Sequence, residues 1–410
     1  VLGILITSSF SLINLNYETF FTRQVNLNFK KFFHATYFLS LFSIIGIFTT
    51  SNIYHLFLFI EIFNFSSINM LSAYISKEVN TDIYKFYTNN VFGSFILCIA
   101  IFYLSLYFNT SDIISIKQQI SSINLSSNYF IVFILLLLII GFVLTFLMFN
   151  IRSIESKKKM SFNVSTTNNI FMSASVGLYL IDYFLFDIFN IKMEKYVLYI
   201  LYVILSSFVV YYSTLILFIK DNSVYNVFFN FVRINIYYCL LGIITQNSAI
   251  SSNIMVLNIL ENCIINYPIY LISVYLGEVH HSTNYRLLDE KEYFLLKMFL
   301  IFLILFKICI PGTMSYYSAR ILTNFFGLSR NYLMLFVIYV NKIIAAAFLV
   351  KFFFFKGRKK FIVQTFEFKR GRLYQYKVSL VLSFLVIVIF MMVFWSPAMD
   401  WARGDWLATL

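Results

Sequence analysis

Charged residues are scarce in this chain of 410 residues, since Asp, Glu, Lys and Arg together make up 12% of it while 60% is hydrophobic. A soluble domain of this length needs a larger charged surface, so the composition excludes a water-soluble protein. The alternation of polar and apolar residues that is typical of transmembrane β-strands is also missing. The composition therefore indicates a helical membrane protein.

The residues that build cofactor and metal sites are few and scattered. The four cysteines have apolar neighbours and no metal-ligand spacing, and neither do the four histidines: Cys98, Cys239, Cys263, Cys309, His34, His55, His280 and His281. Glu278 beside the two adjacent histidines could suggest a metal, but a polar loop explains that cluster better. No glycine-rich phosphate loop or nucleophile elbow is found. We therefore expect no metal, no flavin, haem or iron–sulfur cofactor, and no catalytic residue of a soluble-enzyme type in this chain.

Long apolar runs are abundant, and each is about the 20 residues that a helix needs to cross a hydrocarbon core of about 30 Å. Backbone amides in lipid must be satisfied internally, so such runs form helices. We expect an all-α integral membrane protein with about twelve spans, forming a single polytopic domain over residues 1–410. The expected spans are 1–18, 35–50, 53–76, 88–108, 128–150, 168–188, 196–219, 225–247, 252–276, 292–327, 332–351 and 376–396.

The tenth span is too long for one straight crossing and contains Pro311-Gly312 near its middle. Proline removes a helix donor and glycine frees the backbone, so the sequence predicts one broken helix there. Charge supports this topology. Most of the 31 Lys and Arg residues fall in loops on one side, which the positive-inside rule makes the cytoplasm-like side, here the matrix. The opposite side has only Lys117, Lys192, Lys195, Arg330 and Arg403. This loop charge accounts for the net charge of +13 without a nucleic-acid partner.

The apolar composition has an unusual bias, with 51 Phe and 30 Tyr. Phe, Ile, Tyr, Asn and Lys are encoded by AT-rich codons, which favours an AT-rich mitochondrial genome and an inner-membrane location. The alternative is that Phe simply suits lipid, although lipid does not explain the Tyr and Asn.

Ionisable residues inside membrane spans are costly, so each is a functional hypothesis. The candidates for proton transfer are Glu61, Lys85, Asp182, Glu261, Lys307 and Lys342. Arg233 and Arg320 cannot release a proton at usable pH, so they would act only as electrostatic modulators. The alternative for each residue is an interhelical ion pair or a side chain that reaches the membrane surface, which we favour for Lys297, Lys351, Lys377 and Asp187 near span ends. Lys307 lies four residues before Pro311, beside backbone groups that the predicted break leaves unpaired. A proton relay would require a titratable group at such a place.

Several motifs carry a resemblance to a known family. LFLFIEIFNFSSINMLSAY contains Glu61, Asn64 and Ser66, and Lys85-Phe86-Tyr87 opens the next span 24 residues later. ICIPGTMSYYSARILTNFFGL has a broken-helix step, and the last span ends in WSP. Over roughly residues 50–396, this order resembles the antiporter-like membrane-arm subunits of respiratory complex I, and most of all NADH dehydrogenase subunit 2. The antiporter-like core would cover about 50–351, and 376–396 would be the terminal anchoring helix.

The resemblance implies a subunit that couples quinone reduction elsewhere to proton transfer across the membrane. It implies paralogous membrane-arm subunits as partners, bound phospholipid, and flavin, iron–sulfur and quinone sites on other subunits. The sequence also departs from the family. Thr145, Ser175 and Ala319 stand where the family has titratable residues, usually lysine, and Asn235 stands where it has histidine.

These departures leave several interpretations open. Either proton transfer is altered or lost and the subunit serves as a scaffold, or the line of proton-carrying residues has moved to residues such as Lys307. Pro311-Gly312-Thr313 slightly favours the subunit-4 paralogue within the family. A stand-alone secondary transporter or flippase, or a purely structural membrane subunit, are the alternatives outside it.

Overall fold

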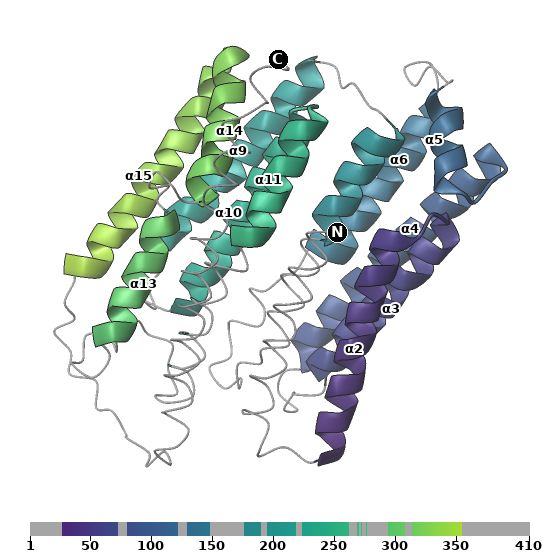
Figure 1. Cartoon of the computed structure of the whole chain (residues 1–410), viewed down its shortest axis with the longest axis horizontal. Helices are drawn as coiled ribbons and strands as arrows, with labels where there is room; N and C mark the ends of the chain where they lie inside the picture. The colour runs from purple at the N-terminus through teal and green to yellow at the C-terminus, as the bar shows by residue number, and fades with distance from the viewer. Residues whose placement is uncertain are drawn as a thin grey trace. The chain divides into compact units, whose positions relative to one another are not determined.

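The computed structural model describes residues 27–72, 80–121, 129–147, 176–189, 195–218, 224–261, 294–307 and 314–354, together with 269, 272 and 276. Every named element in these ranges is a helix (Figure 1). Four helical segments are long and apolar enough to cross a membrane: Asn90–Phe108, Tyr129–Phe146, Leu198–Phe218 and Tyr332–Lys351. The predicted all-α membrane fold is confirmed in kind, while the count of twelve spans stays a prediction.

The chain divides into two compact units. Unit 1 comprises Val1–Lys195 with Thr245–Met255, and unit 2 comprises Tyr196–Ile244 with Val256–Leu410. The boundaries predicted for the core and the terminal helix are not tested by this division. The expected spans 1–18 and 376–396 lie outside the described residues, as do Pro311 and Gly312 between α13 and α14.

Unit 1 contains α2 (Leu27–Thr49), α3 (Ile53–Ser72), α4 (Asn80–Phe108), α5 (Ile113–Ser121) and α6 (Tyr129–Phe142). Helix α2 packs on α3, and α4 packs on α6. Glycine allows the second pair to approach closely, because a Cβ added at Gly141 would lie 2.5 Å from Leu97 Cγ. Most of these helices begin or end within a few residues of the spans that the apolar runs predict.

The apolar runs do not predict helix α5, because residues 109–127 lie between two expected spans and are expected to form a loop. Ile113, Ile116 and Ile120 form its buried side, and this spacing of three and four residues makes one face of a helix. Two backbone hydrogen bonds join the start of α5 to the start of α3. Ile53 N donates to Ser111 O at 2.9 Å, and Ile113 N donates to Ser51 O at 2.8 Å. A nine-residue amphipathic helix is shorter than a membrane span, so a search for long apolar runs overlooks it.

Two short π-helices were also not predicted. They are η4 (Val143–Leu147) and η5 (Tyr183–Ile188), and the second follows a helical segment at 176–182. The rings of Phe142 and Phe184 lie 5.3 Å apart and bring the two segments together. Such widened turns occur often at functional sites. Thr145 lies within η4, and Asp182 directly precedes η5. Each π-helix therefore contains or adjoins a residue that the sequence predictions name.

Unit 2 contains α9 (Lys195–Phe218), α10 (Val224–Ile244), α13 (Phe294–Lys307), α14 (Met314–Leu328) and α15 (Tyr332–Phe354). Helix α11 (Ser248–Glu261) begins in unit 1 and ends in unit 2. Helices α14 and α15 pack together across a tight turn. Arg330 adopts a φ of 54° in that turn, a left-handed conformation that reverses the chain within three residues.

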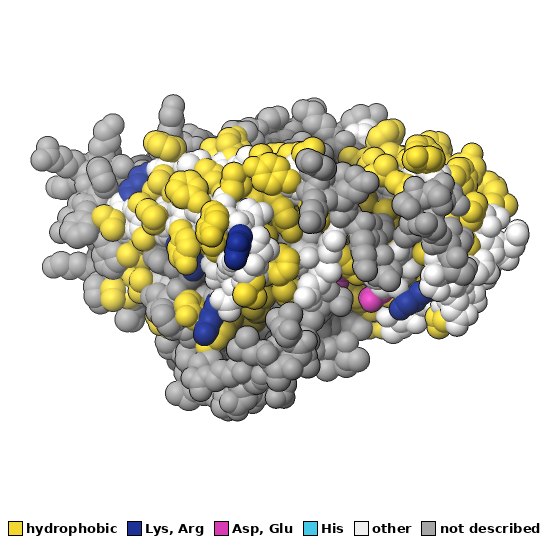
Figure 2. Space-filling view, turned by 90° about the horizontal axis from the view of Figure 1, so that it is seen from above, with side chains coloured by type: hydrophobic (Ala, Val, Ile, Leu, Met, Phe, Trp, Pro, Cys, Tyr) yellow, Lys and Arg dark blue, Asp and Glu magenta, His cyan; other side chains and the backbone are white. Residues whose placement is uncertain are grey.

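Much of the surface that Figure 2 shows is apolar, with isolated Lys and Arg side chains inside it. Exposed aromatic and aliphatic side chains run along several helices, for example Phe65 at 63% and Phe336 at 68% exposure. Exposed apolar helix faces of this extent are suited to a hydrocarbon environment rather than to water.

Candidate functional site

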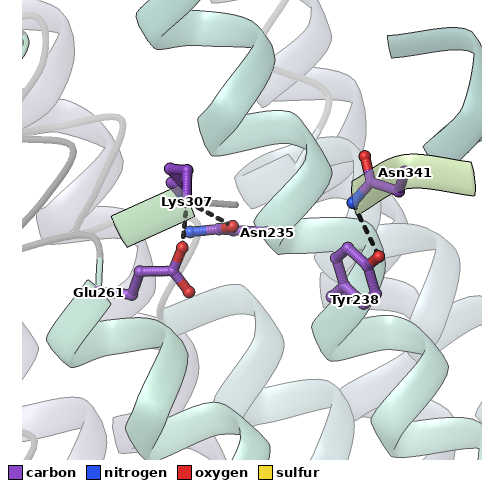
Figure 3. A network of polar contacts seen from close by, with 5 residues as sticks. All are labelled: Asn235, Tyr238, Glu261, Lys307 and Asn341. Atoms are coloured by element: carbon purple, nitrogen blue, oxygen red, sulfur yellow. Dashed lines mark hydrogen bonds and ion pairs between the residues drawn. The ribbon is translucent and has the colours of Figure 1, made fainter. Parts of the chain in front are cut away.

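The most strongly buried charges of the described residues lie together in unit 2. Lys307 at the end of α13 forms an ion pair with Glu261 at the end of α11, and each side chain is 5% exposed. Lys307 Nζ also donates to Asn235 Oδ1 on α10 at 2.8 Å. Figure 3 shows the three side chains converging from three helices. Two residues predicted as proton carriers and one position of family departure thus form one site.

The surroundings of Lys307 explain how a charge is tolerated there. Its Nζ lies 5.5 Å from the ring centroid of Phe231, one turn before Asn235 on α10. The aromatic face adds a weak attraction for the ammonium group. Even so, the Glu261 carboxylate is the main compensation, because removing one partner of a buried ion pair costs about 3–5 kcal/mol. The ammonium and the carboxylate also share a hydrogen bond.

A second polar group continues along α10 from this site. Asn341 on α15 donates from Nδ2 to Tyr238 OH at 2.7 Å, and Ser213 on α9 donates to Asn341 Oδ1. Tyr238 lies three residues after Asn235, so the two polar contacts follow one another on the same helix (Figure 3). The sequence predictions do not include Tyr238, Asn341 and Ser213. The available signal was the presence of Asn and Ser in otherwise apolar spans.

The other cations predicted in unit 2 have different contacts. Arg233 Nη1 donates to Asn230 Oδ1 at 3.3 Å, and its guanidinium carbon lies 5.2 Å from the Tyr212 ring centroid. Lys342 Nζ lies 5.5 Å from the ring centroid of Tyr339 on its own helix. Arg320 is exposed on α14, next to the buried Ala319. These contacts do not join the three residues to the Lys307 site.

In unit 1, the family-like glutamate has a different environment. One carboxylate oxygen of Glu61 on α3, Oε1, is buried and has no hydrogen-bond partner in the described part of the chain. Close by, Asn64 Nδ2 donates to Ser94 Oγ on α4 at 3.2 Å. Lys85 lies in α4, but its side chain is outside the described residues. Among the described side chains, only neutral groups are placed around this carboxylate.

Thr145 occupies the position where the resemblance expects a lysine. It is 4% exposed and donates from Oγ1 to Gly141 O at 2.8 Å. A Cβ added at Gly93, the neighbour of Ser94, would lie 2.7 Å from Thr145 Cγ2. Thr145 and the Asn64–Ser94 hydrogen bond near Glu61 therefore lie at the same turn of α4.

Asp182 has one described partner, since Ser251 Oγ donates to its Oδ1. This contact ties the start of η5 to α11 within unit 1. Ser175, His280 and His281 lie outside the described residues. Among the residues that the structure does describe, no group of three or more His, Cys, Asp or Glu is placed to hold a metal ion.

Comparison with known proteins places the fold among membrane complexes. No family model and no curated protein matches the sequence. A chain of the membrane-bound sulfane sulfur reductase (MBS), an archaeal respiratory membrane complex, has a TM-score of 0.73 at 15% identity, covering 98% of this chain and 81% of that one. A chain of the Mrp complex from Dietzia sp. DQ12-45-1b has a TM-score of 0.69 at 14% identity, covering 88% and 67%.

These likenesses show a shared fold over nearly the whole chain. The two structures belong to membrane complexes, so a multi-pass membrane fold agrees with the apolar helices described above. At these identities the functional residues do not carry over. They have to be argued from this chain's own site.

Proposed function

We propose that this chain is an antiporter-like membrane-arm subunit of a proton-translocating respiratory complex, and that Lys307 and Glu261 carry out its proton transfer. The observation that supports this most is the buried Lys307–Glu261–Asn235 site within a helical membrane fold. The fold likeness to a chain of an archaeal respiratory membrane complex agrees with such a role. The sequence motifs make the finer proposal NADH:ubiquinone oxidoreductase of the mitochondrial inner membrane, with this chain resembling subunit 2.

The chemistry of the site suits proton transfer rather than redox catalysis. A proton that moves from Lys307 Nζ to the Glu261 carboxylate leaves an amine and a carboxylic acid, so the pair loses its charge but keeps its hydrogen bond. The amine can then take a new proton as the acid releases one. Asn235 stays neutral throughout and holds the Nζ in place through its Oδ1. Flavin, iron–sulfur clusters and quinone would lie on other subunits, and phospholipid would cover the exposed apolar helix faces.

Two measurements test the proposal. In native gels of detergent-solubilised membranes, this chain should migrate with NADH:quinone reductase activity. Lys307→Ala should then lower the number of protons moved per electron while electron transfer continues. Lys297→Ala is the matched control, because Lys297 belongs to the same helix but lies near its start. Migration of the chain by itself would contradict the proposal and favour a stand-alone transporter or flippase.

A scaffold without proton transfer is the second candidate function. It is favoured by Thr145 and Ala319, which put uncharged buried side chains where the resemblance expects titratable ones. This candidate predicts an unchanged proton-to-electron ratio for Lys307→Ala in an assembled complex. The subunit-4 paralogue makes the same predictions as subunit 2, and mass spectrometry of the neighbouring chains would separate those two.

A further inference from the structure

We infer that Tyr238 and Asn341 are positioning residues for the Lys307 site, because their hydrogen bond fixes the rotation of α10 that presents Asn235 to the Lys307 ammonium group. The inference rests on the proposed proton transfer at Lys307, and it adds the residues that hold one of its acceptors in place. Neither Tyr238 nor Asn341 has to carry a proton itself.

Three residues form one stripe on α10. Phe231, Asn235 and Tyr238 are spaced by four and three residues, which places them on the same face of an α-helix. The first two are buried, and both contact Lys307. Its Nζ lies 5.5 Å from the ring centroid of Phe231 and donates to Asn235 Oδ1 at 2.8 Å. A contact that fixes the third residue of the stripe therefore also helps to fix the two that touch Lys307.

Asn341 on α15 provides that contact. Its Nδ2 donates to Tyr238 OH at 2.7 Å, and its Oδ1 accepts from Ser213 Oγ on α9. Ser213 is 1% exposed, and its hydroxyl also lies 2.6 Å from Val209 O on its own helix. The Asn341 amide therefore bridges α9 and α10, and it holds Tyr238 from the α15 side (Figure 3).

An aromatic stack on another face of α10 constrains its rotation less closely. The ring of Tyr237 stacks on Phe208 and Tyr212 of α9, with centroid separations of 5.1 and 5.5 Å. Stacked rings tolerate sliding, because they attract each other over centroid separations of about 4.5–7 Å. A hydrogen bond is limited to a donor–acceptor distance of about 2.7–3.2 Å and depends on its angle. The Tyr238–Asn341 bond therefore defines the rotation of α10 more closely than this stack.

The position of Asn235 affects the proposed proton transfer directly. Asn235 Oδ1 and a Glu261 carboxylate oxygen both accept hydrogen bonds from Lys307 Nζ. A displacement of Asn235 Oδ1 by about 1 Å would lengthen its contact beyond hydrogen-bond distance, and functional groups have to be held within about 0.5 Å and 10–20° of their working geometry. Lys307 would then lose its amide partner and spend less time in the orientation from which the proton moves.

Removal of one hydroxyl tests the inference in the full chain within its native complex. Proton transfer is measured beside electron transfer in sealed membrane vesicles, and the part lost in Lys307→Ala is the Lys307-dependent part. We expect Tyr238→Phe to lower that part by about three- to tenfold, the effect of one hydrogen bond, and Asn341→Leu to lower it equally. Tyr237→Phe is the matched control, because it removes the neighbouring hydroxyl but keeps the ring stack. It should leave proton transfer at the wild-type level.

A double variant separates positioning from general packing. Asn235→Ser shortens the acceptor, so α10 no longer has an amide to align with Lys307. In that background, Tyr238→Phe should cause a further loss of less than about twofold, because the two residues act through one contact. Wild-type proton transfer in Tyr238→Phe and Asn341→Leu, or losses of Tyr238→Phe and Asn235→Ser that multiply, would overturn the inference but leave the proposed function standing. Unchanged proton transfer in Lys307→Ala would overturn the proposed function and the inference with it.

Discussion

The two units each place a glutamate within their helices, yet only one of these carboxylates has a described cation beside it. Glu261 in unit 2 pairs with Lys307, and Asn235 completes the site. Glu61 in unit 1 has neutral neighbours and a buried oxygen without a described partner. A glutamate inside a membrane helix is therefore not by itself a sign of ion-pair chemistry, because the partner decides what the carboxylate can do.

The difference also bears on the two interpretations that the departures from the family left open. In unit 1, Thr145 fills the expected lysine position and bonds to its own helix at Gly141 O. In unit 2, the cation comes from Lys307, at the end of α13 and beside Asn235. The proposed proton transfer therefore rests on unit 2, and a passive unit 1 is a hypothesis that the variants below test.

The largest effect is expected from removing the cation of unit 2. Lys307→Ala leaves Glu261 buried without compensation, which should lower the free energy of unfolding by about 3–5 kcal/mol. Thermal unfolding of the purified chain in detergent measures this loss. The double variant Lys307→Met with Glu261→Leu is the control, because it removes both charges and replaces them with side chains of similar volume. It should recover most of the stability, and a double variant as unstable as Lys307→Ala would show that packing dominates rather than charge.

The sequence predicts the two charged residues of this site but not their contact. Lys307 and Glu261 were each identified because a charge within an apolar span is costly. Their partnership was not, since they are 46 residues apart and the rotation of α11 and α13 decides whether they meet. The positions of most helices followed from apolar run length. Helix α5 and the two π-helices did not, because one is too short for a span and the others change the turn width without a clear periodic signal.

A second prediction compares how tightly glycine is packed in the two units. Gly93→Ala in unit 1 should destabilise by about 1–3 kcal/mol through overpacking, because the new Cβ would lie 2.7 Å from Thr145 Cγ2 and 2.9 Å from its backbone nitrogen. Gly327→Ala in unit 2 is the matched control, since nothing lies within 4 Å there. It should leave stability unchanged or raise it by up to about 1 kcal/mol through helix propensity. Equal losses in thermal unfolding would mean that Gly93 has room to adjust.

A third prediction tests the passive role of unit 1 directly. Glu61→Gln keeps the shape of the side chain, and no described cation loses a partner. It should therefore change the free energy of unfolding by less than about 1 kcal/mol and leave the proton-to-electron ratio unchanged. Glu261→Gln is the comparison, because it leaves the Lys307 ammonium without its carboxylate. A large fall in proton transfer with Glu61→Gln would show that unit 1 is active, with Lys85 as the first residue to test.

The smallest effect concerns a carboxylate outside the membrane spans, at the start of α5. Asp112 Oδ2 accepts hydrogen bonds from Ser115 Oγ at 2.7 Å and from Ser115 N at 2.9 Å. These bonds favour the ionised form, so they lower the pKa of Asp112 below its ordinary value of 3.8. Because the folded pKa is depressed, the stabilisation is fully present above pH 3.8 and is lost as the pH falls through the folded pKa.

Asp112→Asn separates the charge from the helix cap. Asparagine can still accept a hydrogen bond from the backbone at this position, but it does not titrate. The variant should therefore unfold like wild type near pH 7 and show a weaker loss of thermal stability as the pH falls below 3.8. Unfolding curves of both proteins across this range give the comparison, with Asp112→Ala showing the loss of the cap at every pH. Identical acid dependence of wild type and Asp112→Asn would mean that the turn joining α4 to α5 is held by its backbone hydrogen bonds to Ser51 and Ile53, and not by this carboxylate.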